Sequence, residues 1–183
     1  MHEGNGIMGG TGEQEVRLNQ LSNVNVLHIR SAYFMENFLR TIGLIKKMGF
    51  NGTAADGSHA IPMVATQDVA EIAAGHLANL DFNLKSVHAV MGPRNYTYSD
   101  FTGIIGKAIG KPELPYIQIP VEQVKQTFLG NGFSEDFTNN LIEMGTAIKS
   151  GFMNYQKRGA STTTPTTAED FVTKVYLPRY NEQ

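Results

Sequence analysis

The segment from Asn25 to Asn37 constrains the fold more than any other stretch of the sequence. It begins with the apolar run Val26–Ile29, typical of a short strand, and changes after Arg30 to an aromatic-led pattern typical of a helix. In open α/β sheets, ligands bind in the crevice beyond the carboxyl ends of the strands. The residues that follow Ile29 are therefore expected to lie where a ligand would bind.

Short apolar strands alternate with amphipathic helices over the first two thirds of the chain. The predicted strands are residues 24–29, 60–64, 86–91 and 116–119. The predicted helices are residues 13–21, 33–48, 67–80 and 97–109, with Thr66 capping the third and a Thr97–Asp100 capping box starting the fourth. The glycine-rich residues 4–12 are expected to form a loop. This alternation favours a mostly parallel sheet in which strands 24–29, 86–91 and 116–119 lie side by side in a single layer.

From Pro120 onward the pattern is helical. Ser134 is expected to cap one helix, and Thr166 with Glu169 forms a capping box for the last helix, which Pro178 is expected to end. The sequence therefore predicts an α/β protein with two parts: a sheet-forming domain in residues 1–119 and a helical lobe in residues 120–183.

Composition excludes several classes of function. The net charge of -2 gives no reason to expect nucleic acid or an anionic membrane as partner, and the absence of cysteine excludes disulfides and thiolate chemistry. No apolar run approaches the roughly 20 residues that span a bilayer. The five histidines form no His-x-x-x-His motif, so no metal site is predicted. A cytoplasmic location is the expectation.

The residues Arg30-Ser31-Ala32-Tyr33-Phe34-Met35-Glu36-Asn37 resemble the R-P-x-Y-F-M-E-N turn of the NmrA-like family. These atypical short-chain dehydrogenase/reductase relatives bind NAD(P) on a Rossmann-like sheet. Ser31 stands where the family usually has proline. The resemblance runs from about Gly4 to about Tyr180 but covers the second half of the family's length. It implies that residues 1–119 are the C-terminal part of the NAD(P)-binding domain and that residues 120–183 form the substrate lobe.

The resemblance also places the cofactor's nicotinamide end against the residues after the first strand. The implied cofactor-binding residues are Arg30, Ser31, Ala32, Tyr33, Phe34 and Asn37. The residue types leave alternatives open. Arg30 suits a phosphate or a structural carboxylate, Tyr33 could stack on a flat ring, Phe34 could belong to the core, and Asn37 could donate to a ligand carbonyl or be a surface residue.

Two parts of the family's machinery are missing from this sequence. The glycines at Gly4–Gly12 follow no strand, so they do not make a phosphate-binding turn, and Tyr-x-x-x-Lys, the proton-transfer pair of classical members, does not occur. We therefore expect a C-terminal portion of a longer or truncated NmrA-like protein that binds NAD(P) weakly or not at all by itself. The catalytic residues stay unassigned.

The resemblance implies either a reductase of small carbonyl or quinone-like compounds or a redox-sensing regulator. The alternative is a non-enzymatic interaction module that forms a homodimer through its exposed sheet edge, because an edge strand presents unpaired N–H and C=O groups.

Overall fold

The computed structural model describes residues 6–151 and 157–182. The elements in chain order are α1 (Met8–Asn19), β1 (Val26–Ser31), β2 (Tyr33–Phe34), the 3-10 helix η1 (Met35–Thr41), α2 (Ile42–Met48), β3 (Asn51–Thr53), β4 (Ile61–Val64), α3 (Thr66–Asn79), β5 (Lys85–Val90), β6 (Asn95–Tyr96), α4 (Tyr98–Ala108), β7 (Tyr116–Gln118), α5 (Val121–Gly130), α6 (Glu135–Lys149), α7 (Ala168–Phe171), the π-helix η3 (Val172–Tyr176) and α8 (Leu177–Glu182).

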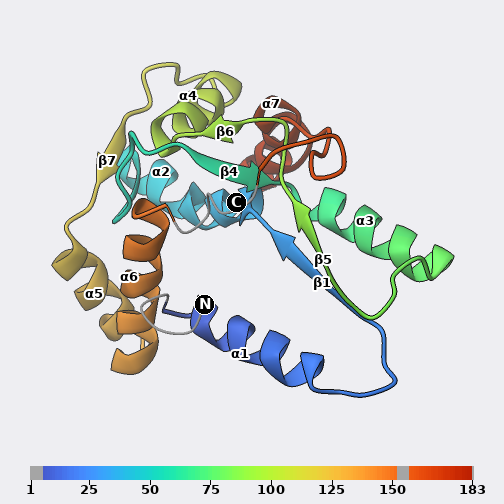
Figure 1. The fold of residues 1–183 in the computed structure, drawn as a ribbon. Helices are drawn as coiled ribbons and strands as arrows, with labels where there is room; N and C mark the ends of the chain where they lie inside the picture. Colours follow the sequence, from blue (N-terminus) through green and yellow to red (C-terminus); the bar gives the residue numbers. More distant parts are fainter. Residues whose placement is uncertain (1–5, 152–156, 183) are drawn as a thin grey trace.

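Most of the strand pairs are parallel. β1 and β5 pair over six residues, with Val26 opposite Lys85 and Ser31 opposite Val90. β2 pairs with β4 and β3 pairs with β7, also in parallel, whereas β4 and β6 are antiparallel. The predicted α/β class with a mostly parallel arrangement of strands is therefore confirmed, and Figure 1 shows how the helices surround these strands.

The expectation that three strands lie side by side in a single layer is wrong. β7 pairs with β3 and not with the β1–β5 pair. Residues 51–53 carry the turn-type sequence Asn-Gly-Thr, so no strand was predicted there. Backbone hydrogen bonds from Asn51 N–H to the Pro115 carbonyl (3.0 Å) and from Ile119 N–H to the Thr53 carbonyl (2.8 Å) extend the pairing. Residues 51–53 are therefore extended because they pair with β7, and not because of their own strand propensity.

The predicted helix over residues 33–48 is divided into three elements. Pairing of Tyr33 and Phe34 with β4 holds them extended as β2, a 3-10 helix follows, and regular α-helix begins at Ile42. Tertiary pairing has overridden the helical pattern at its first residues. Phe38, Ile42 and Ile45 of the predicted stripe are buried, but Phe34 is 37% exposed.

Two predicted helix starts are confirmed. At α4, Thr97 Oγ1 accepts a hydrogen bond from Asp100 N–H (2.9 Å), and Asp100 Oδ2 accepts one from Thr97 N–H (3.1 Å). At α6, Ser134 Oγ accepts from Phe137 N–H (3.2 Å). Each contact satisfies a backbone donor that has no partner inside the helix.

Two other threonines do not cap the helices predicted for them, because carboxylates of other elements bind their hydroxyls. Thr66 is the first residue of α3 and donates its hydroxyl to Glu36 (2.6 Å). Thr166 donates its hydroxyl to Asp68 of α3 (2.6 Å), and Thr167 caps α7 one residue later than predicted.

Both ends of the described chain are more helical than predicted. α1 begins at Met8, so the loop predicted for residues 4–12 is wrong from there on, while residues 4 and 5 lie outside the described ranges. Pro178 does not end the last helix. It is the second residue of α8, which follows directly on the π-helix η3 and continues to Glu182.

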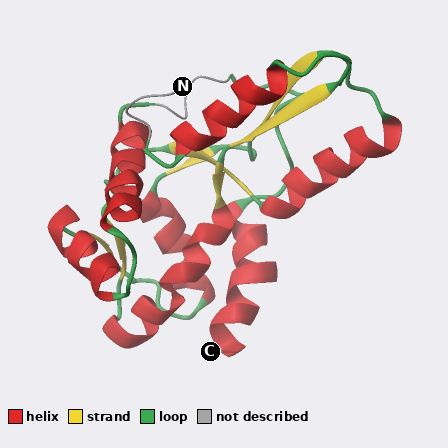
Figure 2. Ribbon diagram, turned by 90° about the horizontal axis from the view of Figure 1, so that it is seen from below, coloured by secondary structure: helices red, strands yellow, loops and turns green. Residues whose placement is uncertain are grey.

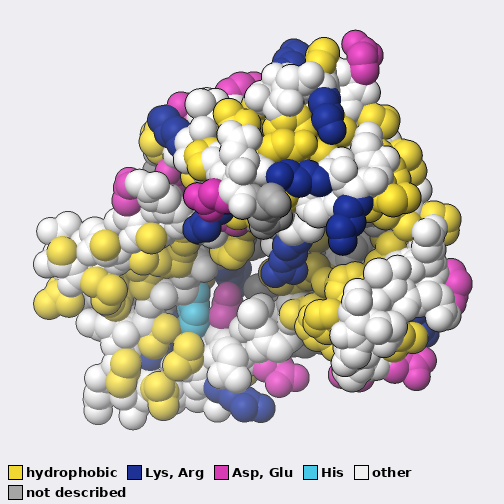
Figure 3. All heavy atoms as spheres, turned by 180° about the vertical axis from the view of Figure 1, so that it is seen from behind, with side chains coloured by type: hydrophobic (Ala, Val, Ile, Leu, Met, Phe, Trp, Pro, Cys, Tyr) yellow, Lys and Arg dark blue, Asp and Glu magenta, His cyan; other side chains and the backbone are white. Residues whose placement is uncertain are grey.

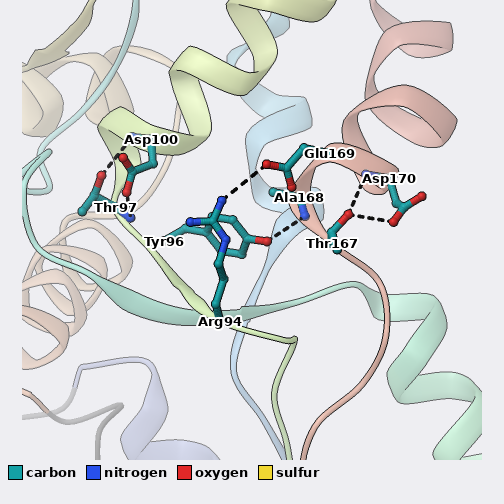
Figure 4. Close-up of polar contacts among 8 residues, drawn as sticks. All are labelled: Arg94, Tyr96, Thr97, Asp100, Thr167, Ala168, Glu169 and Asp170. Atoms are coloured by element: carbon teal, nitrogen blue, oxygen red, sulfur yellow. Dashed lines mark hydrogen bonds and ion pairs between the residues drawn. The ribbon is translucent and has the colours of Figure 1, made fainter.

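The C-terminal helices pack on a core of five aromatic side chains that are at most 2% exposed, called here the aromatic core: Phe38, Tyr96, Phe101, Phe171 and Tyr176. The Phe38 and Phe101 rings are stacked with centroids 4.0 Å apart. The Tyr96 hydroxyl accepts from Ala168 N–H at 3.0 Å, and Arg94 lies over the Tyr96 ring and pairs with Glu169 (Figure 4). These contacts join β6 to the start of α7.

The β1–β5 pair extends away from this core, with α1 and α3 on opposite sides of it (Figures 1 and 2). We call α1, β1, α3 and β5 the arm, and the elements around the aromatic core the body. Within the described residues, β1 and β5 form a sheet of two strands, so β1 has one edge without a strand partner. Several large apolar side chains of the arm and its loops are exposed: Val16, Leu18, Leu77, Leu80, Leu84 and Val87.

Candidate functional site at the end of β1

Arg30, near the end of β1, is held by α1. Its Nε lies 3.0 Å from Glu15 Oε1 and its Nη2 lies 2.5 Å from Glu15 Oε2. Both side chains are mostly shielded from solvent, with 26% and 20% of their surfaces exposed. Such a bidentate pair is the strongest geometry between guanidinium and carboxylate. Arg30 therefore pairs with a structural carboxylate, as one of the two alternatives proposed. Its contact with a cofactor phosphate stays a prediction.

Ser31 and Ala32 shape the turn out of β1. Ser31 is the last residue of the strand, and Ala32 N–H donates to the Val90 carbonyl at 2.8 Å. The Ala32 side chain is buried. These two residues therefore fix the path of the backbone that leads to Tyr33.

Three tyrosines from separate elements gather beyond this turn, and we call them the tyrosine cluster. Tyr33 comes from β2, Tyr98 is the first residue of α4, and Tyr116 is the first residue of β7. Ring centroids are 5.7 Å apart between Tyr33 and Tyr98 and 5.8 Å apart between Tyr98 and Tyr116. Sequence reasoning did not assign Tyr98 or Tyr116 to the site. The available signal was the position of Tyr98 immediately after the Thr97 cap.

The Tyr116 phenol is fixed by polar contacts and by a close backbone. Its hydroxyl donates to the Ala55 carbonyl at 2.8 Å and lies 2.7 Å from Thr53 Oγ1. Gly57 approaches the ring so closely that an added Cβ would lie 2.5 Å from Tyr116 Cδ1. A glycine at position 57 is therefore needed for this placement of the ring.

Burial raises the pKa of all three phenols above its usual value. For Tyr98, desolvation is the main cause, and the neighbouring Tyr33 adds to it. For Tyr33, hydrogen bonding with Tyr98 and Asn37 and the charge of Arg40 lower the pKa but do not outweigh burial. Desolvation also dominates the raised pKa of Tyr116. At neutral pH the cluster consists of neutral phenols, which can donate hydrogen bonds to an oxygen or pack against a flat ring but do not act as phenolate bases.

Glu36, which sequence reasoning also did not select, lies between Tyr33 and Asn37 in the chain. Its Oε1 accepts from Thr66 N–H (2.9 Å) and from the Thr66 hydroxyl, which anchors the start of α3. Its Oε2 is buried and has no hydrogen-bond partner. Burying a carboxylate oxygen without a donor is unfavourable, so this atom is suited to receive a hydrogen bond from a ligand.

The structure thus brings two of the predicted site residues, Tyr33 and Asn37, together with the unpredicted Tyr98 and Tyr116. Arg30 is held against α1, and Phe34 remains partly exposed on β2. On the rear face of the molecule, Figure 3 shows a central hollow with several Lys and Arg side chains around it.

Within residues 6–151 and 157–182, no three or more His, Asp or Glu side chains are grouped to hold a metal ion. In the same ranges, no helix has the length and hydrophobicity needed to cross a bilayer.

Comparison with known proteins places this arrangement in a class. No protein-family model matches the chain. A nucleoside-diphosphate-sugar epimerase from Staphylococcus aureus superposes with a TM-score of 0.73 and 19% identity, covering 95% of this chain and 61% of the epimerase. An NADPH-dependent quinone oxidoreductase from Escherichia coli, complexed with NADPH, gives a TM-score of 0.69 and 19% identity over 90% of this chain and 58% of that one. The chain therefore has a Rossmann-like fold shared with NAD(P)-binding proteins.

Within that class, the fold is that of the NmrA-like, atypical short-chain dehydrogenase/reductase proteins. The negative transcriptional regulator NmrA, in complex with NADP, matches with a TM-score of 0.51 and 11% identity over 92% of this chain and 57% of its own. The festuclavine dehydrogenase of Aspergillus fumigatus is 25% identical over 137 residues, which are 73% of this chain and 47% of the dehydrogenase. The predicted resemblance is confirmed, and the chain spans the C-terminal half of these relatives.

Proposed function

We propose that this chain is the substrate side of an NAD(P)H-dependent NmrA-like reductase and that the tyrosine cluster faces the nicotinamide end of the cofactor. The observation that carries the proposal is the convergence of three neutral phenols beyond the end of β1, at the edge where open α/β sheets bind ligands. The proposal includes a cytoplasmic location.

The phenols favour flat, oxygen-bearing substrates such as quinones or small conjugated carbonyl compounds. Aromatic rings pack well against flat partners, and a neutral phenol donates a hydrogen bond to a carbonyl oxygen. Two of the solved structures with this fold are described as a quinone oxidoreductase and a triphenylmethane reductase, whose named substrates contain six-membered carbon rings.

The residues present fit one end of NAD(P) better than the other. Tyr33, Asn37 and the unpaired Glu36 Oε2 offer an aromatic face, amide groups and an acceptor, which suit the nicotinamide ring and its carboxamide. When bound, the cofactor supplies the hydride, while Tyr33 of the tyrosine cluster orients the substrate oxygen. The glycines of residues 9–12, by contrast, lie inside α1 and do not follow a strand. We therefore propose weak or no dinucleotide binding by this chain alone.

A second candidate function is redox sensing without turnover. It is favoured by the raised pKa of the three phenols and by the absence of Tyr-x-x-x-Lys from the sequence, because neither leaves an evident proton-transfer group. NmrA, which shares the fold, is itself described as a transcriptional regulator.

Saturation-transfer NMR with NADPH tests the orientation of the cofactor, because it detects weak binding and reports which ligand protons touch the protein. We expect transfer to nicotinamide protons to exceed transfer to adenine protons, and we expect Tyr33→Ala to abolish it. Phe133→Ala, which alters a separate aromatic contact with Phe128 and Phe137, is the matched control and should leave transfer unchanged. Transfer mainly to adenine, or equal loss in both variants, would rule out the proposed orientation.

Calorimetry tests whether the chain alone binds the dinucleotide. Titration of the purified chain with NADPH should give no saturable micromolar binding. A micromolar dissociation constant would show that the chain holds the pyrophosphate by groups other than the family's glycine-rich turn. Oxidation of NADPH by the chain when a quinone is added would favour the reductase over the sensor.

A further inference from the structure

His76 of α3 and His88 of β5 face each other in the arm. Their rings are nearly perpendicular with centroids 5.0 Å apart, and His76 Nε2 lies 2.7 Å from His88 Nδ1. The outer nitrogen of each ring has its own partner. Asp81 Oδ1 is 2.5 Å from His76 Nδ1, and the Ser161 carbonyl oxygen is 2.8 Å from His88 Nε2. Groups from three segments of the chain thus form one line of contacts.

The outer partners determine where the ring hydrogens lie. A carboxylate and a carbonyl oxygen accept hydrogen bonds, so His76 Nδ1 and His88 Nε2 each carry a hydrogen. If both rings are neutral, the two inner nitrogens direct lone pairs at each other across 2.7 Å, which is repulsive. A cation between the rings removes the repulsion, either as an extra proton shared by the two nitrogens or as a metal ion.

The outer partners are those found around metal-bound histidines. A histidine that ligates a metal usually donates its other ring N–H to a carboxylate or a backbone carbonyl, which fixes the tautomer and the ring orientation. Asp81 supplies the first kind of partner and Ser161 the second. Zn–N bonds of about 2.0–2.1 Å in tetrahedral geometry separate two ligand nitrogens by about 3.3 Å. The two nitrogens therefore need to move apart by about 0.6 Å, and the rings need to turn so that both lone pairs point at the ion.

We propose that His76 and His88 form a binding site for a divalent transition-metal ion of the kind that prefers imidazole, with Zn²⁺ as the reference ion. Asp81 and Ser161 are positioning groups that orient the two rings. Both imidazoles are partly exposed, so water completes the coordination. The described residues offer no set of three or more protein ligands, and binding is therefore weaker than at a four-ligand structural site.

A bound ion would join α3 to β5 directly and to the Ser161 loop through His88. His76 lies near the end of α3, His88 lies in β5, and Ser161 belongs to the loop that forms the Met91–Thr163 bridge before α7. Because the ion binds the folded arrangement, it stabilises that arrangement by mass action. The site therefore couples the position of α3 to the segment that leads into the body.

Calorimetry with Zn²⁺ on the full chain tests the site. We expect one saturable ion per chain, with binding abolished in His76→Gln and in His88→Gln. Asp81→Asn keeps both ligands and should weaken binding by about 10–100-fold, which is the usual effect of losing such a partner. His2→Gln, outside the described residues, is the control and should bind as the unaltered chain does.

A second measurement protects the test against variants that fold poorly. In the unaltered chain, Zn²⁺ should shift the ring-proton NMR signals of two histidines together and raise the melting temperature. Absence of saturable Zn²⁺ binding in the unaltered chain, or shifts confined to other histidines, would overturn the proposal.

Discussion

The arm and the body differ sharply in how far their helices are buried. In the body, α4 buries Tyr98, Phe101, Thr102, Ile105 and Gly106. In the arm, α1 buries Gly12 and α3 buries Asp68. Leu77 is 66% exposed, Leu80 73% and Leu84 77%. These exposed leucines make the arm the better candidate for an interaction surface, whereas the apolar side chains of α4 are buried in the core.

The two ends of α3 also differ in how far their apolar side chains are buried. The predicted apolar stripe of α3 includes Val69, Ile72, Leu77 and Leu80. Val69 and Ile72 pack against the core cluster, whereas Leu77 and Leu80 do not find cover within the described structure. A periodic stripe thus indicates which face of a helix seeks cover, and the fold decides how much of that face receives it.

The largest expected effect is in the aromatic core. Phe101→Ala should lower the free energy of unfolding by about 3–5 kcal/mol, because it removes a buried ring stacked on Phe38. The matched arm variant, Leu77→Ala, should change it by about 0.5 kcal/mol or less. Urea denaturation of the isolated chain measures both. Equal losses would mean that the arm is as well buried as the body.

The next effect concerns self-association, which the exposed edge and apolar surface of the arm favour. If two copies pair through this surface, Leu77→Lys should weaken association by about 2 kcal/mol, near the value of burying one leucine side chain. Sedimentation equilibrium measures the change, and Lys174→Ala on the body is the control. A chain that is monomeric over a wide concentration range would remove the homodimer alternative.

A smaller effect is expected where the two regions are joined. Asp68 of α3 is buried and accepts hydrogen bonds from Thr166 N–H (3.2 Å) and the Thr166 hydroxyl. Asp68→Ala leaves both donors without their partner and should cost about 1–3 kcal/mol. Glu71→Ala, one turn further along α3 and exposed, should be near neutral in the same denaturation experiment.

The smallest expected effect concerns helix caps. α7 in the body has the Thr167 cap, whereas α1 in the arm begins without a side-chain cap at Ile7. Thr167→Ala should cost about 1 kcal/mol. Ile7→Asp, which adds a capping side chain to α1, should raise stability by less than about 1 kcal/mol. The melting temperatures of the two variants measure the two effects.

The cap also predicts a dependence of stability on acidic pH. Hydrogen bonding by Thr167, followed by the contacts of Lys174, lowers the pKa of Asp170 below its usual value. A carboxyl with a lowered folded-state pKa stabilises the fold above its ordinary pKa of about 3.9 and loses this contribution as pH falls through the lowered value. Thr167→Ala should therefore flatten the loss of stability at acidic pH. An unchanged pH profile would contradict this assignment.

The sequence predicted the parts of the fold that local chemistry decides. The Thr97–Asp100 box, the Ser134 cap and the burial of Phe38, Ile42 and Ile45 all follow from residues a few positions apart. It did not predict outcomes that depend on distant partners. Thr66 and Thr166 were misassigned because Glu36 and Asp68 reach them from 30 and 98 residues away. The cofactor roles predicted for the segment from Arg30 to Asn37 stay predictions. Tyr98 and Tyr116 entered the candidate site because the fold brings them beside Tyr33.

The pairing of β3 with β7 has a consequence for the chain during its synthesis. Residues 51–53 have little preference for a strand of their own, and their hydrogen-bond partners are residues 115–118. During synthesis on the ribosome, the backbone groups of residues 51–53 cannot form these hydrogen bonds until more than sixty further residues have been translated and have left the exit tunnel. The contact between Tyr116 and Thr53 in the tyrosine cluster therefore cannot form before both segments have emerged.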